Sequence, residues 1–208
     1  NRRTCGLYWR LCLMRVVCLI SGSGSNLQAL IDCERHGQLG TATLVGVIAN
    51  RQDAQGLKRA ASAMIPTHVV DHRSYADRLA FDRALIDVID PLKPDLVVLA
   101  GFMRILSDPF VEHYKGRLIN IHPSLLPKYK GLDTHQRALA SGDKTAGATV
   151  HWVTQALDSG EIIRQIEVPI LPDDTADSLQ ARVLAAEHTL YPSVVRDLSL
   201  GVISPCDA

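Results

Sequence analysis

Short apolar runs alternate with segments of helical spacing along most of this chain. The run Leu96–Ala100 contains no polar residue, which is typical of a parallel strand that is covered on both faces. Comparable β-rich runs predict further strands at Val16–Ile20, Thr43–Ile48, Thr67–Val70, Leu118–His122, Ala148–Val153 and Ile162–Val168.

The segments between these runs have the spacing of amphipathic helices. The clearest is Asp77–Ile89, in which Leu85 and Ile89 lie one turn apart on the same face, and Pro91 follows as a helix breaker. Residues 123–146 have no such period over most of their length, and a stretch of this kind is often a functional lid. Further helices are predicted at Leu27–Arg35, Ala54–Ala63, near Gln136–Ala140 and at Thr175–Asp197.

The order of these elements predicts an α/β fold. Alternating strands and helices form an open, mostly parallel twisted sheet with helices on both faces, a Rossmann-like arrangement. The last two predicted strands form an antiparallel β pair in the C-terminal part. A length of 208 residues suits one domain, and there are no repeats or linkers. We therefore expect a single domain at residues 15–208 and an N-terminal extension at residues 1–14.

The N-terminal segment Asn1–Ile20 is basic and then apolar, as in a signal peptide. Arg10 and Arg15 interrupt its apolar run, and no small-residue cleavage site follows. The segment also leads directly into a Gly-rich turn that needs a strand before it. We therefore interpret its last residues as the first strand, with Met14 as a candidate natural start.

Composition and charge exclude several classes of function. Apolar residues make up 47% of the chain and charged residues 21%, and the net charge is zero. This balance is typical of a globular protein and gives no indication of a nucleic-acid or membrane surface. The five cysteines include no CxxC pair, and no Cys/His cluster has the spacing of metal ligands. We expect a cytoplasmic protein that binds small molecules and no metal.

The first candidate site is the loop Ser21–Asn26, between the first strand and the first helix. Its two glycines allow a tight turn, and backbone N–H groups at a helix N-terminus can bind an anion. Leu27 occupies the position of the third glycine in a dinucleotide fingerprint, which disfavours NAD. A single phosphate fits the loop better, and a Gly-rich turn without a ligand is the alternative.

The second candidate is the pair Asn120 and His122, at the end of a predicted strand. Residues i and i+2 of a strand face the same side, so these two side chains project together. Ligands of open α/β sheets bind at the carboxyl ends of the strands. An amide N–H can donate to a developing oxyanion, and an imidazole can move a proton near neutral pH. The alternative is a hydrogen-bonded structural pair.

Three further side chains are open to a role in that site. Asp158 could orient a histidine, but an aspartate beside Gly160 is more often ordinary turn chemistry. His135 and His151 could lie near the site, and by themselves they are interpreted as structural.

Four sequence blocks together resemble a known family. The chain is similar to the folate-dependent, single-domain phosphoribosylglycinamide formyltransferases, from about Arg15 to about Pro192. The resemblance rests on Ile20–Leu27 (ISGSGSNL), Leu99–Leu106 (LAGFMRIL), Ile119–Gly131 (INIHPSLLPKYKG) and Glu187–Pro192 (EHTLYP). It departs at Ser23, where asparagine is common in the family, and at Asp133, where histidine is common.

The resemblance implies a fold, an activity and site residues. The fold would be the Rossmann-like formyltransferase fold. The activity would be transfer of a formyl group from 10-formyltetrahydrofolate to the amine of glycinamide ribonucleotide, in de novo purine synthesis, by a monomer or homodimer without a metal. By resemblance the catalytic residues are Asn120, His122 and Asp158, and the substrate-binding residues are Gly24, Ser25, Asn26, Leu184, Ala185, Ala186 and Glu187. The implied folate-binding residues are Arg78, Met103, Arg104, Ile105, Leu106, Asn120, Thr154, Gln155, Ala156, Leu157 and Asp158.

Two other functions remain as alternatives at this point. Another formyl-folate enzyme, such as a methionyl-tRNA formyltransferase, would share the SLLP block but have a different N-terminal loop and a C-terminal tRNA-binding domain. A nucleotide-binding module with an inactive site would lack turnover, and the presence of Asn120, His122 and Asp158 together argues against it.

Overall fold

A seven-stranded sheet forms the centre of the computed structural model, which describes residues 13–205. The strand order is β3-β2-β1-β4-β5-β6-β7, and the first five strands in the chain are parallel. Strands β6 and β7 are antiparallel to their neighbours, so the sheet changes direction at β5. The strands are β1 (Met14–Ile20), β2 (Ala42–Ala49), β3 (Thr67–Val69), β4 (Leu96–Leu99), β5 (Leu118–His122), β6 (Thr145–Trp152) and β7 (Ile162–Pro169).

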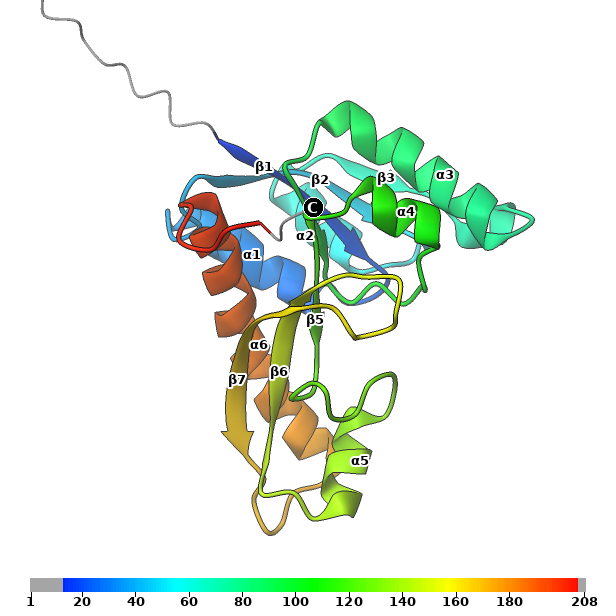
Figure 1. Ribbon diagram of the computed structural model, residues 1–208. Helices are drawn as coiled ribbons and strands as arrows, with labels where there is room; N and C mark the ends of the chain where they lie inside the picture. Colours follow the sequence, from blue (N-terminus) through cyan, green and yellow to red (C-terminus); the bar gives the residue numbers. More distant parts are fainter. Residues whose placement is uncertain (1–12, 206–208) are drawn as a thin grey trace, which may run out of the picture.

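Helices cover both faces of the sheet, as Figure 1 shows. One face packs against α1 and α6, and the other packs against α3 and α4. Along β1 the fully buried Val16 and Cys18 face the first core and Val17 faces the second, which explains why this strand has no polar alternation. The helices are α1 (Ser25–Arg35), α2 (Gly56–Ser62), α3 (Arg78–Ile89), α4 (Asp108–His113), α5 (Thr134–Ser141) and α6 (Ala176–Ser199), with 3₁₀ turns η1 (His72–Ser74) and η2 (Asp90–Leu92).

The predicted fold class is confirmed, and apart from the two 3₁₀ turns and shifts of one or two residues at element ends, the elements differ from expectation in two places. Helix α4 was not predicted, because a helix of six residues is too short to show a period. Strand β6 begins at Thr145, before the expected Ala148. Residue 147 of this strand is a glycine because a Cβ there would collide with the carbonyl oxygen of Ile166. Glycine is usually depleted in strands, so the sequence pattern placed the start after it.

The N-terminal boundary is described only in part. Strand β1 begins at Met14, one residue before the expected start of the domain, and the proposed extension lies mostly outside the described residues. No helix within residues 13–205 combines the length and apolar character that a membrane crossing requires.

Tyr191 joins the longest helix to the two strands beside the sheet's change of direction. Its side chain on α6 is completely buried, and its hydroxyl donates to the carbonyl oxygens of Leu99 (2.9 Å) and Ile119 (3.2 Å). These carbonyls belong to β4 and β5, so the Tyr191 hydroxyl connects α6 to both strands.

We expect Tyr191→Phe to lower stability by about 1–3 kcal/mol, because two buried carbonyls lose a donor. For a chain of this size each kcal/mol corresponds to a fall of roughly 2–4 °C in melting temperature. Thermal denaturation measures the change. Tyr75→Phe is the matched control, because the Tyr75 hydroxyl has no hydrogen-bond partner within the described part of the chain. Equal melting temperatures for the two variants would contradict this role.

Candidate active site

Strand β5 carries Asn120 and His122 to the carboxyl edge of the parallel part of the sheet. Their shared orientation follows from the two-residue period of a strand, and both side chains line one cavity of about 620 Å³. His122 is buried and Asn120 is half-buried. The prediction that the two project together is confirmed.

Asp158 lies in the loop between β6 and β7, and its carboxylate faces His122. Oδ2 of Asp158 is 3.4 Å from Nδ1 of His122, and both side chains are only 7% exposed. The same oxygen accepts a hydrogen bond of 2.9 Å from the backbone N–H of Gly131. Asp158 does have a turn conformation, with φ of 46°, but turn chemistry does not account for a buried carboxylate aimed at a histidine.

His151 is a site residue that sequence reasoning interpreted as structural. It lies on β6 directly opposite Asn120 in the antiparallel register. Its Nδ1 donates to the carbonyl of Trp152 (2.9 Å), which leaves Nε2 free to accept from the Asn120 amide at 3.3 Å. Burial lowers the pKa of His151, and the carboxylate of Asp158, 3.7 Å away, opposes that shift. A neutral His151 can therefore hold the Asn120 amide in one orientation. Only the strand register could have indicated this contact.

Two loops form the walls of the cavity beside Asn120. All of Met103–Leu106 and all of Thr154–Asp158 line it, as the resemblance implied. Met103, Ile105 and Leu157 are exposed apolar side chains at its rim. Such a volume with an apolar lining and few polar groups is typical of a small-molecule site. Arg78 differs from the rest of the implied set, because it is exposed at the first residue of α3 and does not line the cavity.

A buried carboxylate fixes the first of these loops. Oδ2 of Asp82, on α3, accepts a 2.6 Å hydrogen bond from the backbone N–H of Ser107. Burial raises the pKa of Asp82, and the hydrogen bonds from Ser107 oppose that shift. At the other end of the loop, the N–H of Met103 donates to Oγ of Ser21 (2.8 Å). This second bond also connects the loop to the Gly-rich turn after β1.

The Gly-rich turn lines a second cavity of about 630 Å³. Gly24 has φ of 70°, and a Cβ on it would lie 2.6 Å from the Cα of Gly56, so only glycine fits. The backbone N–H groups that follow begin α1, and this is the arrangement that favours an anion. Nε of Arg59 donates to the carbonyl of Ser23 (2.7 Å), which places a positive charge beside the turn.

Glu187 of α6 also lines this second cavity, in contact with the turn. Its side chain is buried, and Oε2 accepts a 2.7 Å hydrogen bond from the amide of Asn26. Burial raises its pKa from 4.5 to about 7, and the bond from Asn26 acts in the opposite direction. Leu184 lines the same cavity, whereas Ala185 and Ala186 do not.

The two cavities adjoin at the end of β5. Gly101, Met103, Arg104 and His135 are among the residues that line both, so ligands in the two cavities would meet there. Asn120, His122 and Asp158 line the first cavity beside this junction, so the chemistry available there is an amide donor, a histidine and a buried carboxylate. Among residues 13–205 there is no group of three or more His, Cys, Asp or Glu side chains that could hold a metal ion.

Comparisons with known proteins agree with this geometry. A family model described as formyl transferase matches residues 14–195. The chain is 52% identical to phosphoribosylglycinamide formyltransferase of Escherichia coli over 88% of this chain and 85% of that protein. It is 50% identical to the trifunctional purine biosynthetic protein adenosine-3 of Drosophila melanogaster over 92% of this chain but only 14% of that protein.

A solved structure agrees as well. The phosphoribosylglycinamide formyltransferase of Coxiella burnetii has a TM-score of 0.89 and 48% identity, and the match covers 93% of this chain and 90% of that one. Because the family match, the sequence identity and the fold extend over nearly the whole chain, the protein belongs to the phosphoribosylglycinamide formyltransferases of the formyl transferase family.

Proposed function

We propose that this protein transfers the formyl group of 10-formyltetrahydrofolate to the amine of glycinamide ribonucleotide, a step of de novo purine synthesis. The observation that carries the proposal is the junction of two cavities beside Asn120, His122 and Asp158, which line the first of them. Transfer between two bound molecules needs such a junction, because the reacting atoms must be held together.

The ribonucleotide is assigned to the cavity beside the Gly-rich turn. Its phosphate would bind the backbone N–H groups of Gly24, Ser25 and Asn26, where the positive end of α1 and the guanidinium of Arg59 favour an anion. The buried Glu187 faces the same cavity and would contact the ribose side.

The folate is assigned to the cavity beside Asn120. The apolar rim made by Met103, Ile105 and Leu157 suits a flat aromatic ring system, and the loop that ends at Asp158 closes one side. Arg78 remains a folate contact on the family resemblance alone.

The chemical step is attack of the substrate amine on the formyl carbon. The resulting oxyanion would be stabilised by the Asn120 amide, oriented by His151, and by protonated His122. One such donor is typically worth about 3 kcal/mol in the transition state. The bond between the formyl carbon and N10 would then break as His122 gives a proton to N10 of the leaving folate, and the proton lost by the attacking nitrogen would return His122 to its charged form. Asp158 would hold the ring and balance its positive charge. No covalent intermediate with the protein is required.

Asn120→Ala should lower kcat by roughly 100-fold or more, because the oxyanion loses a preorganised donor. The KM values should change less, since the amide acts mainly in the transition state. Steady-state formyl transfer measures both. Gln52→Ala, at an exposed amide outside both cavities, is the control. A kcat close to that of the wild type would remove the oxyanion role.

Glu187→Gln should raise stability at alkaline pH. The folded state holds the Glu187 proton more tightly than the unfolded chain does, because its pKa is about 7 rather than 4.5. Stability is therefore lost as pH rises through this window, by up to about 3 kcal/mol, and a neutral amide avoids the loss. The variant should match the wild type near pH 4.5 and exceed it near pH 8.

Urea denaturation of the ligand-free protein at the two pH values tests this expectation. Glu112→Gln, at an exposed carboxylate, is the matched control. If the difference between Glu187→Gln and the wild type were the same at both pH values, a buried and protonated Glu187 would be excluded.

Residues 15–208 are proposed to carry the whole activity. A chain that starts at Met14 retains all of β1, whose register with β2 begins at that residue. Deleting residues 1–13 should therefore leave kcat and melting temperature nearly unchanged. Deleting residues 1–20 removes β1 and should abolish folding, because β1 contributes to both cores. A large loss of activity from the shorter deletion would assign a role to the extension.

A further inference from the structure

The catalytic histidine has a second hydrogen-bond partner besides Asp158. Nε2 of His122 is 2.8 Å from the backbone carbonyl oxygen of Tyr129, and a carbonyl can only accept. Nε2 therefore carries a proton whenever this hydrogen bond is made. In a neutral ring that keeps this bond, Nδ1, which faces Asp158, is the nitrogen without a proton.

The carbonyl that accepts from Nε2 of His122 belongs to a residue in an uncommon backbone conformation. Tyr129 has φ of 55°, in the left-handed region that costs a residue with a side chain about 1–2 kcal/mol. Such a conformation persists where the surroundings fix it. Close packing alone does not fix it here, because a cavity of about 210 Å³ lies beside the Tyr129 ring.

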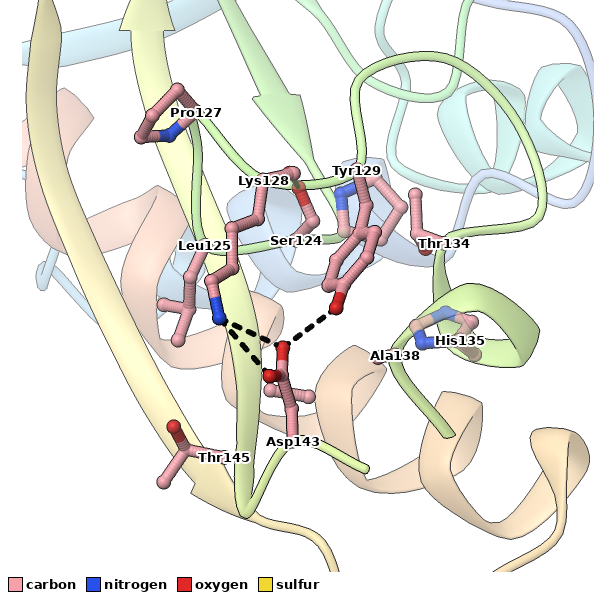
Figure 2. Close-up of a pocket in the computed structure, with 12 residues that line it drawn as sticks. Ser124, Leu125, Pro127, Lys128, Tyr129, Thr134, His135, Ala138, Asp143 and Thr145 are labelled. Carbon is pink, nitrogen blue, oxygen red and sulfur yellow. Dashed lines mark hydrogen bonds and ion pairs between the residues drawn. The ribbon is translucent and has the colours of Figure 1, made fainter. Parts of the chain in front are cut away.

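Polar contacts of the Tyr129 side chain hold the loop instead. Its hydroxyl donates to Oδ2 of Asp143 (2.7 Å) and lies 2.5 Å from Oγ of Ser141. Figure 2 shows the phenol and the Lys128 amine both directed at the Asp143 carboxylate. The Tyr129 hydroxyl, followed by Lys128, lowers the pKa of Asp143, so the group remains an acceptor at neutral pH.

Helix α5 holds the same loop from a second direction. The guanidinium of Arg137 lies 5.3 Å from the centre of the Tyr129 ring and donates to the carbonyls of Lys130 (2.7 Å) and Leu132 (3.2 Å). The backbone that follows the Tyr129 carbonyl is therefore attached to α5 through this side chain.

We propose that Asp143 and the Tyr129 hydroxyl are positioning residues for His122. They hold the Tyr129 carbonyl against Nε2 and so present Nδ1 to Asp158 and to the reacting atoms. Neither side chain lines the two cavities assigned to the substrates, so neither touches the reacting atoms. The inference rests on the catalytic role proposed for His122.

The test is a set of single-group variants in the full chain. Tyr129→Phe removes only the hydroxyl, and Asp143→Ala removes its acceptor. Both should lower kcat about tenfold while the KM values stay within about twofold, because a misplaced catalytic group affects the reaction more than binding. Asp143→Asn keeps an oxygen acceptor and should retain most of the activity. The double variant Tyr129→Phe/Asp143→Ala should be no worse than either single variant, because the two groups act as one unit.

Lys128→Met is the matched control. Its amine bonds the same carboxylate but has no side-chain connection to the Tyr129 carbonyl, and its side chain is 60% exposed. An exposed ion pair contributes little, so this variant should have the kcat of the wild type.

Nitrogen NMR of the His122 ring gives a readout that a merely structural role would not change. The neutral ring of the wild type should be the tautomer with the proton on Nε2, and Tyr129→Phe should give a mixture of tautomers. Unchanged ring signals together with an unchanged kcat in Tyr129→Phe and in Asp143→Ala would overturn the proposal. If Tyr129→Phe gave a mixture of tautomers together with an unchanged kcat, the positioning of the ring by Tyr129 would stand and the catalytic role proposed for His122 would be overturned.

Discussion

The contact between His122 and Asp158 is the interaction on which the rest of the site depends. Both side chains are almost completely buried, and a buried carboxylate is costly unless charge or hydrogen bonds compensate it. The compensation comes from His122 and from the N–H of Gly131. One strand end and two loops must therefore meet at a single point. If one of the three is displaced, a charge is left in the interior without a partner.

The change of strand direction at β5 creates the space for this meeting. In an open parallel sheet, ligands bind beyond the carboxyl ends of the strands, and β5 is the last parallel strand in this one. Because β6 returns antiparallel, it places His151 beside Asn120 without a crossover helix. The loop after β6 starts beside Leu118, at the amino end of β5, and returns toward His122 to bring Asp158 into position. Tyr191 of α6 stabilises this part of the sheet, because its hydroxyl bonds to carbonyls of both β4 and β5.

Hydrogen bonds between loops join the two cavities into one unit. The bond from the N–H of Met103 to Ser21 connects the wall of the cavity beside Asn120 with the Gly-rich turn. Asp82 holds the other end of that wall. An enzyme that combines two substrates gains most when their relative position is fixed in advance. These short bonds between distant segments provide that rigidity, while the cavities themselves stay open to ligands.

The sequence by itself determined the local features of this protein. Unbroken apolar runs predicted buried parallel strands, since β1 and β4 are covered on both faces. The two-residue period of a strand placed Asn120 and His122 on one side. Family motifs implied a role for Asp158 and for the two loops that line the cavity beside Asn120. Each of these inferences concerns neighbours in the chain or a motif read as a whole.

Only the tertiary structure decided which distant groups meet. The register of β6 against β5 made His151 a partner of Asn120, and the fold of the loop after β5 brought the Tyr129 carbonyl to His122. The same structure left Arg78 outside the cavity. A histidine or an aspartate has the same local pattern whether it is structural or functional. The difference arises from the side chains and backbone groups packed against it, and those come from segments whose approach is set by the packing of the whole sheet and its helices.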